Sequence, residues 1–248
     1  TLQNALAAIL LAVSLPHASA ADTRFPAVRT YAGQFADLDA GAWYYESAAA
    51  LYELGLINGQ DGRFAPDSEM TIAEAVTMAA RLRSLYEHGD SEAGPSRHSG
   101  GEWYKPYAAY LQELQVIDRE FDGLYQQAAT RAQMAHILAN TLPQDLFEPI
   151  NGDVVAAGYA NRNYIRDVRD DTPYRQDILA LYTWGISGGV DKTGAFLPEA
   201  HIQRCQVAAM AARLAGSSLR VRLDWAQAYS RAGTTMMDLV ESDGGFYP

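Results

Sequence analysis

Three stretches of the chain repeat one apolar pattern. Apolar residues recur at i, i+4, i+7 and i+10, and the three copies are Tyr44-Ala48-Leu51-Leu54, Tyr104-Ala108-Leu111-Leu114 and Tyr174-Ile178-Leu181-Trp184. Residues at this spacing share one face of an α-helix, so each copy predicts an amphipathic helix. Internal similarity of this kind decides the fold class of the whole chain, because it indicates an array of like units.

A second helix is expected after each stripe. The three candidate starts are Thr71, Thr130 and Gln203, which lie 27, 26 and 29 residues beyond the first residue of the preceding stripe. Thr71 and Thr130 are each followed three residues later by Glu or Gln, the capping-box pattern that opens a helix. The third start lacks the hydroxyl. Sequence identity supports the alignment, since Met78-Ala79-Ala80-Arg81-Leu82 recurs as Met210-Ala211-Ala212-Arg213-Leu214.

Glycine-rich turns join the two helices of a unit. Gly55 to Gly59 in the first unit matches Gly185 to Gly189 in the third, and glycine supplies the positive φ that such turns need. Residues 88–101 and 143–163 are polar or rich in Gly, Pro and Asn, so we expect them to be exposed linkers. The expected units are residues 35–86, 101–142 and 164–216, followed by an extension of unknown role at 217–248.

The amino terminus has the pattern of a secretory signal. Leu6 to Leu15 is an apolar run too short to cross a bilayer, and Ala18-x-Ala20 is typical of a signal-peptidase site. A short buried helix is the alternative. With a signal peptide over residues 1–20 the protein is expected to be secreted, with no membrane attachment after cleavage.

Composition excludes several classes of function. Lys and Arg number 19 against 30 Asp and Glu, a net charge of −11 that repels phosphate backbones, so no nucleic-acid partner is expected. One cysteine, Cys205, excludes an internal disulfide framework and a thiolate-rich zinc site. It aligns with Ala73 and Ala132, which predicts a small packed residue. The five histidines are scattered without ligand spacing, so no metal site and no cofactor are expected.

One catalytic motif occurs in the chain. Gly185-Ile186-Ser187-Gly188-Gly189 fits the G-x-S-x-G pattern of a hydrolase nucleophile elbow. In the repeat alignment Ser187 falls opposite Ile57 in a turn between helices, whereas an elbow requires a preceding strand. Asp61-Gly62 and Asp191-x-x-Gly194 lack the full ligand series of a calcium loop. We therefore expect no catalytic residue.

The ordered motifs resemble a known family. Phe35-x-Asp37-Leu38, Trp43-Tyr44, Gly55-Leu56-x-x-Gly59, Gly62-x-Phe64-x-Pro66 and Thr71-x-x-Glu74 follow one another as in an S-layer homology (SLH) domain. The resemblance implies a mainly α fold of three helix-loop-helix repeats in a pseudo-threefold bundle, with the second helices central. It also implies a function, which is non-covalent anchoring to the bacterial cell surface. The partner would be secondary cell-wall polysaccharide, a peptidoglycan-linked glycan with a pyruvylated sugar, held in grooves between repeats.

The resemblance also implies the site residues. The family's Thr-Arg-Ala-Glu motif survives best at Thr130-Arg131, partly at Gln203-Arg204, and without its cation at Thr71-Ile72. Such an arginine would add its charge to the free N–H groups of a helix amino terminus and so attract a carboxylate. Arg131 is expected to be the stronger ligand because its Thr cap is intact. The full candidate carbohydrate-binding set is Arg131, Arg204, Trp43, Trp103, Asp37, Asp167, Gly59 and Gly189.

Alternatives remain for these residues and for the function. Trp43 and Trp103 are either sugar-stacking residues or core aromatics, and Arg131 and Arg204 are either ligands or solvated charges. The chain is either a wall-binding module, the anchor of a larger exported enzyme or surface protein, or a structural scaffold whose eroded sites bind nothing.

Overall fold

The computed structural model describes residues 24–97, 101–160, 165–191 and 194–223. The described part is helical, with only isolated β-bridges between its segments, which confirms the predicted mainly α fold. The proposed signal peptide and residues 224–248 lie outside it. The α-helices are α1 (Tyr45–Glu53), α2 (Ile72–His88), α3 (Lys105–Glu113), α4 (Arg131–Thr141), α5 (Gly152–Ala160), α6 (Arg175–Thr183) and α7 (Arg204–Ala215). Short 3₁₀ turns are η1 (Pro95–Arg97), η2 (Arg119–Phe121), η3 (Gln144–Leu146) and η4 (Ser217–Leu219).

The predicted capping boxes open α2 and α4. The Thr71 N–H donates to Glu74 over 2.8 Å, and the Glu74 N–H donates back to the Thr71 hydroxyl over 3.2 Å. Thr130 and Gln133 make the same two bonds, at 2.9 and 3.2 Å. These reciprocal bonds satisfy backbone donors that a helix leaves unpaired at its start. The capping boxes in the sequence therefore predict the first residues of α2 and α4 correctly.

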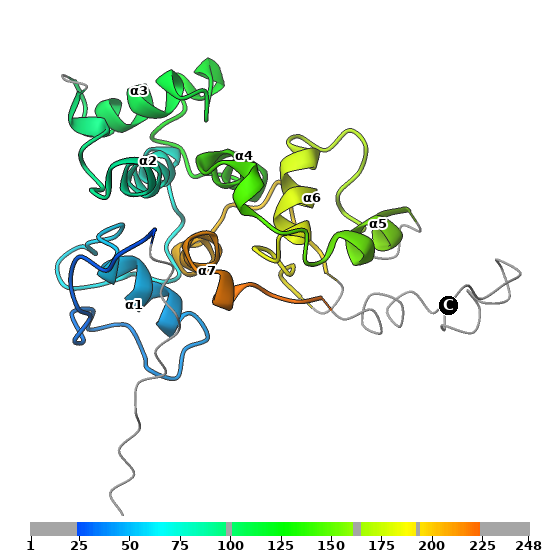
Figure 1. The fold of residues 1–248 in the computed structure, drawn as a ribbon, viewed down its shortest axis with the longest axis horizontal. Coiled ribbons are helices and arrows are strands. Elements are labelled where there is room, and N and C mark those ends of the chain that lie inside the picture. Colours follow the sequence, from blue (N-terminus) through cyan, green and yellow to red (C-terminus); the bar gives the residue numbers. More distant parts are fainter. Residues whose placement is uncertain (1–23, 98–100, 161–164, 192–193, 224–248) are drawn as a thin grey trace, which may run out of the picture.

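The helices form an inner and an outer set (Figure 1). Helices α2, α4 and α7 lie in the middle of the molecule, and α1, α3 and α6 lie around them. Each outer helix packs on the inner helix of another unit, since α3 packs on α2, α6 on α4 and α1 on α7. The packing is thus cyclic, and the first and last helical units are in contact.

A closed ring of backbone hydrogen bonds joins the three inner helices just before they begin. The Met70 N–H donates to Ile202 O (3.0 Å), the Ile202 N–H to Ala129 O (3.0 Å), and the Ala129 N–H to Met70 O (2.8 Å). Every link therefore connects two different units. The exact pseudo-threefold symmetry implied by the resemblance stays a prediction.

The apolar stripes form the core. Leu51, Leu111 and Leu181, which occupy the same position in the three stripes, are all fully buried, as are Phe64 and Phe196 of the two matching turns. Burying a side chain of this size contributes about 1.5–3 kcal/mol. No helix in the described ranges is long and apolar enough to cross a membrane.

The segment expected to be an exposed linker at 143–163 is partly structured, so that prediction was wrong. It contains η3 and α5, and Val154 and Val155 are buried. Asn151, 2% exposed, donates from its side chain to Tyr182 O (3.0 Å) and Val221 O (2.8 Å). The Leu223 N–H donates to the Asn151 side chain over 2.9 Å. The first residues of the carboxyl-terminal extension are therefore held against the third unit.

Candidate functional site

Two grooves gather most of the predicted site residues. The first, here the Arg204 groove, has a volume of about 420 Å³. The side chains and turn that matter most in it are Gly59, Glu74, Thr77, Arg81, Trp103 and Arg204. The second, the Arg131 groove, has a volume of about 300 Å³. Its corresponding residues are Gly189, Gln206, Ala209, Arg213, Trp43 and Arg131.

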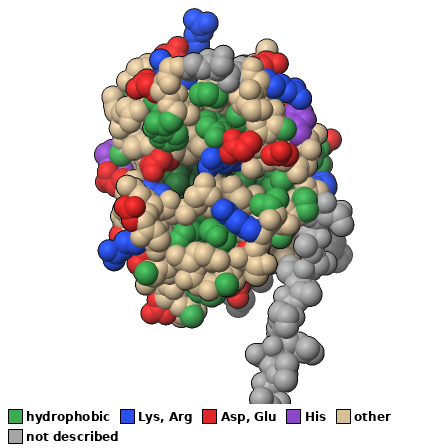
Figure 2. Space-filling model, turned by 90° about the vertical axis from the view of Figure 1, so that its left-hand side faces the viewer, with side chains coloured by type: hydrophobic (Ala, Val, Ile, Leu, Met, Phe, Trp, Pro, Cys, Tyr) green, Lys and Arg blue, Asp and Glu red, His purple; other side chains and the backbone are tan. Residues whose placement is uncertain are grey.

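The two grooves are built in the same way. Each takes its turn and inner helix from one unit, its tryptophan from a second and its arginine from the third, as Gly59, Trp103 and Arg204 illustrate. The cyclic packing of the helices is what brings these distant segments together. Figure 2 shows the side of the molecule on which α1, α2 and α3 lie, where acidic, basic and hydrophobic side chains are interspersed.

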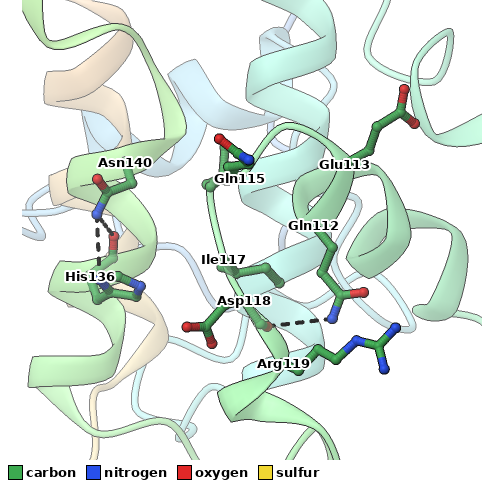
Figure 3. A pocket seen from close by; sticks show the side chains of 9 residues that line it. Gln112, Glu113, Gln115, Ile117, Asp118, Arg119, His136 and Asn140 are labelled. Atoms are coloured by element: carbon green, nitrogen blue, oxygen red, sulfur yellow. Dashed lines mark hydrogen bonds between the residues drawn. The ribbon is translucent and has the colours of Figure 1, made fainter.

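A third groove, the His136 groove, has a different lining. Its volume is about 640 Å³, and Asp118, Arg119, His136 and Asn140 are among its residues (Figure 3). In the repeat alignment Pro173 and Ile72 occupy the tryptophan and arginine positions of the other grooves, and Ile72 is buried. This groove therefore lacks the motif arginine and the tryptophan that the other two share, and its cation, Arg119, comes from a different position.

Trp43 and Trp103 are surface residues. They are 65% and 55% exposed, and each packs edge-on against the tyrosine that follows it, with ring centroids 5.3 and 5.7 Å apart. The alternative that they are core aromatics is therefore wrong. Because more than half of each side chain is exposed, a sugar could contact either indole ring.

Asp37 and Asp167 lie in neither groove lining. The Asp37 carboxylate accepts the N–H groups of Phe64 and Ala65 at 2.7 and 2.8 Å, and Asp167 accepts those of Phe196 and Leu197 at 2.9 and 2.5 Å. Burial raises the pKa of Asp37, but the two backbone donors and Arg63 together bring it below the ordinary value. Both carboxylates hold turns in which a non-glycine residue, Ala65 or Leu197, has positive φ.

The two arginines have opposite environments. Arg131 is 4% exposed, and its Nε donates to Phe196 O at 2.5 Å and a terminal nitrogen to Gln206 at 2.9 Å. Its guanidinium also lies 4.9 Å from the Phe196 ring centroid. Burial lowers the pKa of Arg131. Arg131 is not a solvated charge, because it is buried and two of its nitrogens donate hydrogen bonds within the fold.

Arg204 keeps an unused donor. One terminal nitrogen donates to Glu74 at 2.8 Å, but its buried Nε has no hydrogen-bond partner. The hydroxyl of Thr77, a residue 6% exposed, also has none. Among the described residues these are the two buried side-chain polar atoms without a partner, and both belong to residues lining the Arg204 groove. An unpaired buried polar atom costs about 1–3 kcal/mol, which a bound ligand can recover.

The expectation of free N–H groups at the starts of the inner helices was wrong. The Arg131 and Ala132 N–H groups donate to Ala200 O and Pro198 O, both at 2.9 Å, and the first two N–H groups of α2 and α7 are bonded to other units in the same way. These hydrogen bonds join the start of each inner helix to a segment of another unit, next to the ring formed by Met70, Ala129 and Ile202. An anion in these grooves would therefore have to be held by side chains rather than by these backbone donors.

Sequence reasoning missed Thr77, Arg81 and Arg213 as groove residues. Arg81 and Arg213 were visible as the identical arginine in the two Met-Ala-Ala-Arg-Leu segments, and this recurrence was the available signal. Thr77 carried none, because its matching positions are His136 and Ala209.

Ser187, the residue of the elbow motif, and Cys205 are both packed within the fold. Ser187 follows α6 in a turn, is 3% exposed, and accepts the Gly189 N–H over 3.3 Å. Cys205 is buried, and burial raises the pKa of its thiol. Within the ranges that the structure describes, no cluster of three His, Cys, Asp or Glu side chains could hold a metal ion.

The fold and the grooves together define the class of this protein. It is a helical protein whose units pack in a cycle, and its two arginine-tryptophan grooves are each lined by residues of all three units. Residues 34–76 match the family model of the S-layer homology domain. The S-layer protein sap of Bacillus anthracis is 35% identical over 114 residues, 45% of this chain and 14% of that protein. The amylopullulanase of Thermoanaerobacterium thermosulfurigenes is 27% identical over 120 residues, 46% of this chain and 6% of the relative. The exoglucanase XynX of Acetivibrio thermocellus is 27% identical over 119 residues, 45% and 11% of the two chains.

Residues 34–76 of the chain therefore match an S-layer homology domain, and the chain is similar to S-layer proteins over about 45% of its length. It spans only a small part of the length of these relatives. That residues 101–142 and 164–216 are two further copies of the domain stays our prediction.

Proposed function

We propose that this chain holds a protein on the bacterial cell surface by binding a cell-wall glycan non-covalently, and that it performs no chemistry itself. An anchoring role is supported by the S-layer homology domain and by relatives named as S-layer proteins. The glycan is the finer part of the proposal, with secondary cell-wall polysaccharide as its class. The protein is exported in this proposal, with residues 1–20 as its signal peptide.

The observation that carries the proposal is the pair of unpaired donors in the Arg204 groove. The Arg204 Nε–H and the Thr77 hydroxyl are both polar, buried and unbonded in the free protein, and they belong to residues lining one groove. A carboxylate, such as that of a pyruvylated sugar, accepts hydrogen bonds from both kinds of group. Trp103 offers an exposed aromatic ring to the sugar in the same groove.

The same reasoning assigns a smaller part to the Arg131 groove. Phe196 O and Gln206 already accept from the Arg131 guanidinium, so a ligand would have to compete with them. This reverses the expectation, based on the intact Thr130 cap, that Arg131 is the stronger ligand. Arg204 is the principal ligand in this proposal.

The proposal is tested by isothermal titration of the chain with purified wall polysaccharide. A charge-assisted hydrogen bond contributes about 1.5–3 kcal/mol, so we expect Arg204→Ala to weaken binding by about 10-fold to 150-fold. Arg204→Lys keeps the charge but has no Nε–H, and we expect it to recover only part of the loss. Arg169→Ala, at an exposed position away from the grooves, is the matched control. Unaltered affinity in a folded Arg204→Ala protein would place the glycan elsewhere.

Thr77→Val separates ligand binding from fold loss. Removing an unpaired buried hydroxyl relieves a desolvation cost, so we expect the variant to melt at the same temperature as the parent or higher. The same change removes a ligand donor and should weaken binding about 2-fold to 10-fold. Thr77→Ser keeps the hydroxyl and should bind like the parent. Lower stability in Thr77→Val would instead show that the hydroxyl has a partner within the fold.

A second candidate is that the chain anchors a larger protein. The similarity to enzymes supports it, because matches of 119 and 120 residues cover only 11% and 6% of an exoglucanase and an amylopullulanase. A stretch shared by S-layer proteins and such enzymes behaves as a transferable module. A fusion of this chain to a fluorescent protein should therefore sediment with purified cell walls, and Arg204→Ala should release it. A fusion that stays in the supernatant would favour the purely structural scaffold.

A further inference from the structure

The His136 groove contains a histidine in contact with two other elements. His136 lies on α4, at the position that Thr77 and Ala209 occupy in the other two grooves. Its Nδ1 is 2.8 Å from Asp177 of α6, and its Nε2 is 3.3 Å from Glu120 of η2. One imidazole ring therefore bridges two carboxylates from different segments.

Further contacts fix this arrangement. The Tyr174 ring, at the start of α6, stacks on the imidazole with centroids 4.6 Å apart. The Tyr174 hydroxyl donates to Glu120 over 2.6 Å, and the Asn140 amide of α4 donates to Asp177 over 3.1 Å. Both carboxylates are thus held in place, and His136 cannot turn away from one without breaking its stacking on Tyr174.

The protonation state of His136 decides how many of these bonds exist. A neutral imidazole has one N–H and can donate to only one carboxylate, whereas the imidazolium donates to both. The charged groups around it are Asp177 from α6, Glu120 and Arg119 from η2, and Asp118 directly before η2. Figure 3 shows Asp118 and Arg119. In Figure 3 the Arg119 guanidinium points away from His136, so the carboxylates dominate its surroundings.

We propose that His136 is a proton-dependent clamp that fastens α6 and η2 together onto α4 when its imidazole is charged. The geometry is independent of glycan binding, since neither Arg204 nor Arg131 contributes to it. Burial lowers the pKa of His136, but the hydrogen bond and charge of Asp177, with the charges of Glu120 and Asp118, bring it above the ordinary value. A raised pKa in the folded state means that the added stability is complete below the unfolded pKa, about 6.5, and is lost as pH rises through the folded pKa.

Two measurements on the full chain test the clamp. The first is the pH titration of the His136 ring by NMR, with the resonance identified by its loss in His136→Gln. We expect a midpoint above the ordinary histidine value of about 6.5, and a lower midpoint in Asp177→Asn. A midpoint at or below the ordinary value would overturn the proposal.

The second measurement is the melting temperature between about pH 5.5 and pH 8.5. We expect the parent's advantage over His136→Gln to be largest at the acid end and to shrink as pH rises. The matched control is His201→Gln, because His201 and its partner Glu69 are about half exposed and pair at 3.2 Å on the surface. It should follow the parent at every pH. An advantage over His136→Gln that does not change with pH would reduce His136 to a packing residue.

Discussion

At the scale of the residue, the same motif position serves two purposes in this molecule. Arg131 and Arg204 both open an inner helix, but the Arg131 guanidinium is enclosed by Phe196 and Gln206. Arg204 donates one hydrogen bond, from a terminal nitrogen, to Glu74, and its buried Nε has no partner. Burying a charged side chain is costly unless it is hydrogen-bonded, and the bonds to Phe196 O and Gln206 offset that cost for Arg131. Arg131 is therefore primarily a stability residue.

The stability role predicts a cost of substitution. In Arg131→Met, which keeps the length of the side chain, we expect the free energy of unfolding to fall by about 1.5–3 kcal/mol, because Phe196 O and Gln206 lose a charged donor. Urea denaturation measures the change. Arg169→Met, at an exposed position, should unfold like the parent. If both variants unfold alike, the enclosed guanidinium adds nothing to stability.

Gly59 tests the turn that lines the Arg204 groove. Its φ is +68°, and an added Cβ would collide with the Phe35 ring and the Arg63 carbonyl oxygen. Gly33 also has positive φ, +88°, but nothing lies within 4 Å of its added Cβ. Both alanine variants incur backbone strain of about 1 kcal/mol, and only Gly59→Ala adds the collision. We therefore expect the lower melting temperature for Gly59→Ala, and equal melting temperatures would contradict the crowding of this turn.

The sequence predicted groove membership better than chemical role at this scale. Trp43, Trp103, Gly59 and Gly189 were selected from motif position alone, and the structure places all four in the two arginine-bearing grooves. It did not distinguish Arg131 from Arg204, because the partners that use up Arg131 lie 65 and 75 residues away along the chain. A motif records a residue's neighbours in sequence, whereas hydrogen bonding depends on its neighbours in space.

At the scale of the element, local signals predict the helices that carry them. The apolar stripes located α1, α3 and α6, the capping boxes located α2 and α4, and the repeated Met-Ala-Ala-Arg-Leu segment located α7, but α5 was missed. Gly152 opens α5 and no capping box precedes it. Val154 and Val155 are buried, and α5 packs on α6. Helix α5 therefore depends more on its packing against α6 than on the helix propensities of its residues. The pattern of apolar residues predicts such a helix poorly.

The caps predict a measurable contribution from each box. We expect Thr130→Ala to lower the free energy of unfolding by about 0.5–2 kcal/mol, because the Gln133 N–H loses its acceptor. Thermal or urea denaturation measures it. Thr30→Ala, at an exposed position in irregular structure, is the control and should be neutral. A neutral Thr130→Ala would mean that the Gln133 side-chain bond to the Thr130 N–H suffices to start α4.

At the scale of the whole molecule, the cyclic arrangement makes the units interdependent. Helix α1 packs on α7 and not on the inner helix that follows it, and the ring of bonds through Met70, Ala129 and Ile202 joins all three units. Periodicity predicted pairs of helices but held no information on which helix of one unit packs on which helix of another. Only the family resemblance implied a closed bundle.

The interdependence predicts one unfolding transition for the described part. Chemical denaturation followed by far-ultraviolet circular dichroism and by tryptophan fluorescence should give coincident curves. Trp43 and Trp103 lie on the surface of two units, and Trp184 is buried in the third, so fluorescence samples all of them. Two separated transitions would show that at least one unit unfolds on its own.

The contact between α1 and α7 also concerns the order in which the chain is made. Among the helices in the described ranges, α1 is synthesised first, and α7, on which it packs, is synthesised last. Until α7 emerges, the face of α1 that packs on α7 has no native partner, and such uncovered apolar surface favours aggregation and chaperone binding. The first of the described helices is thus among the last to reach its final place, so a chain interrupted before α7 is expected to be a target for quality-control proteases.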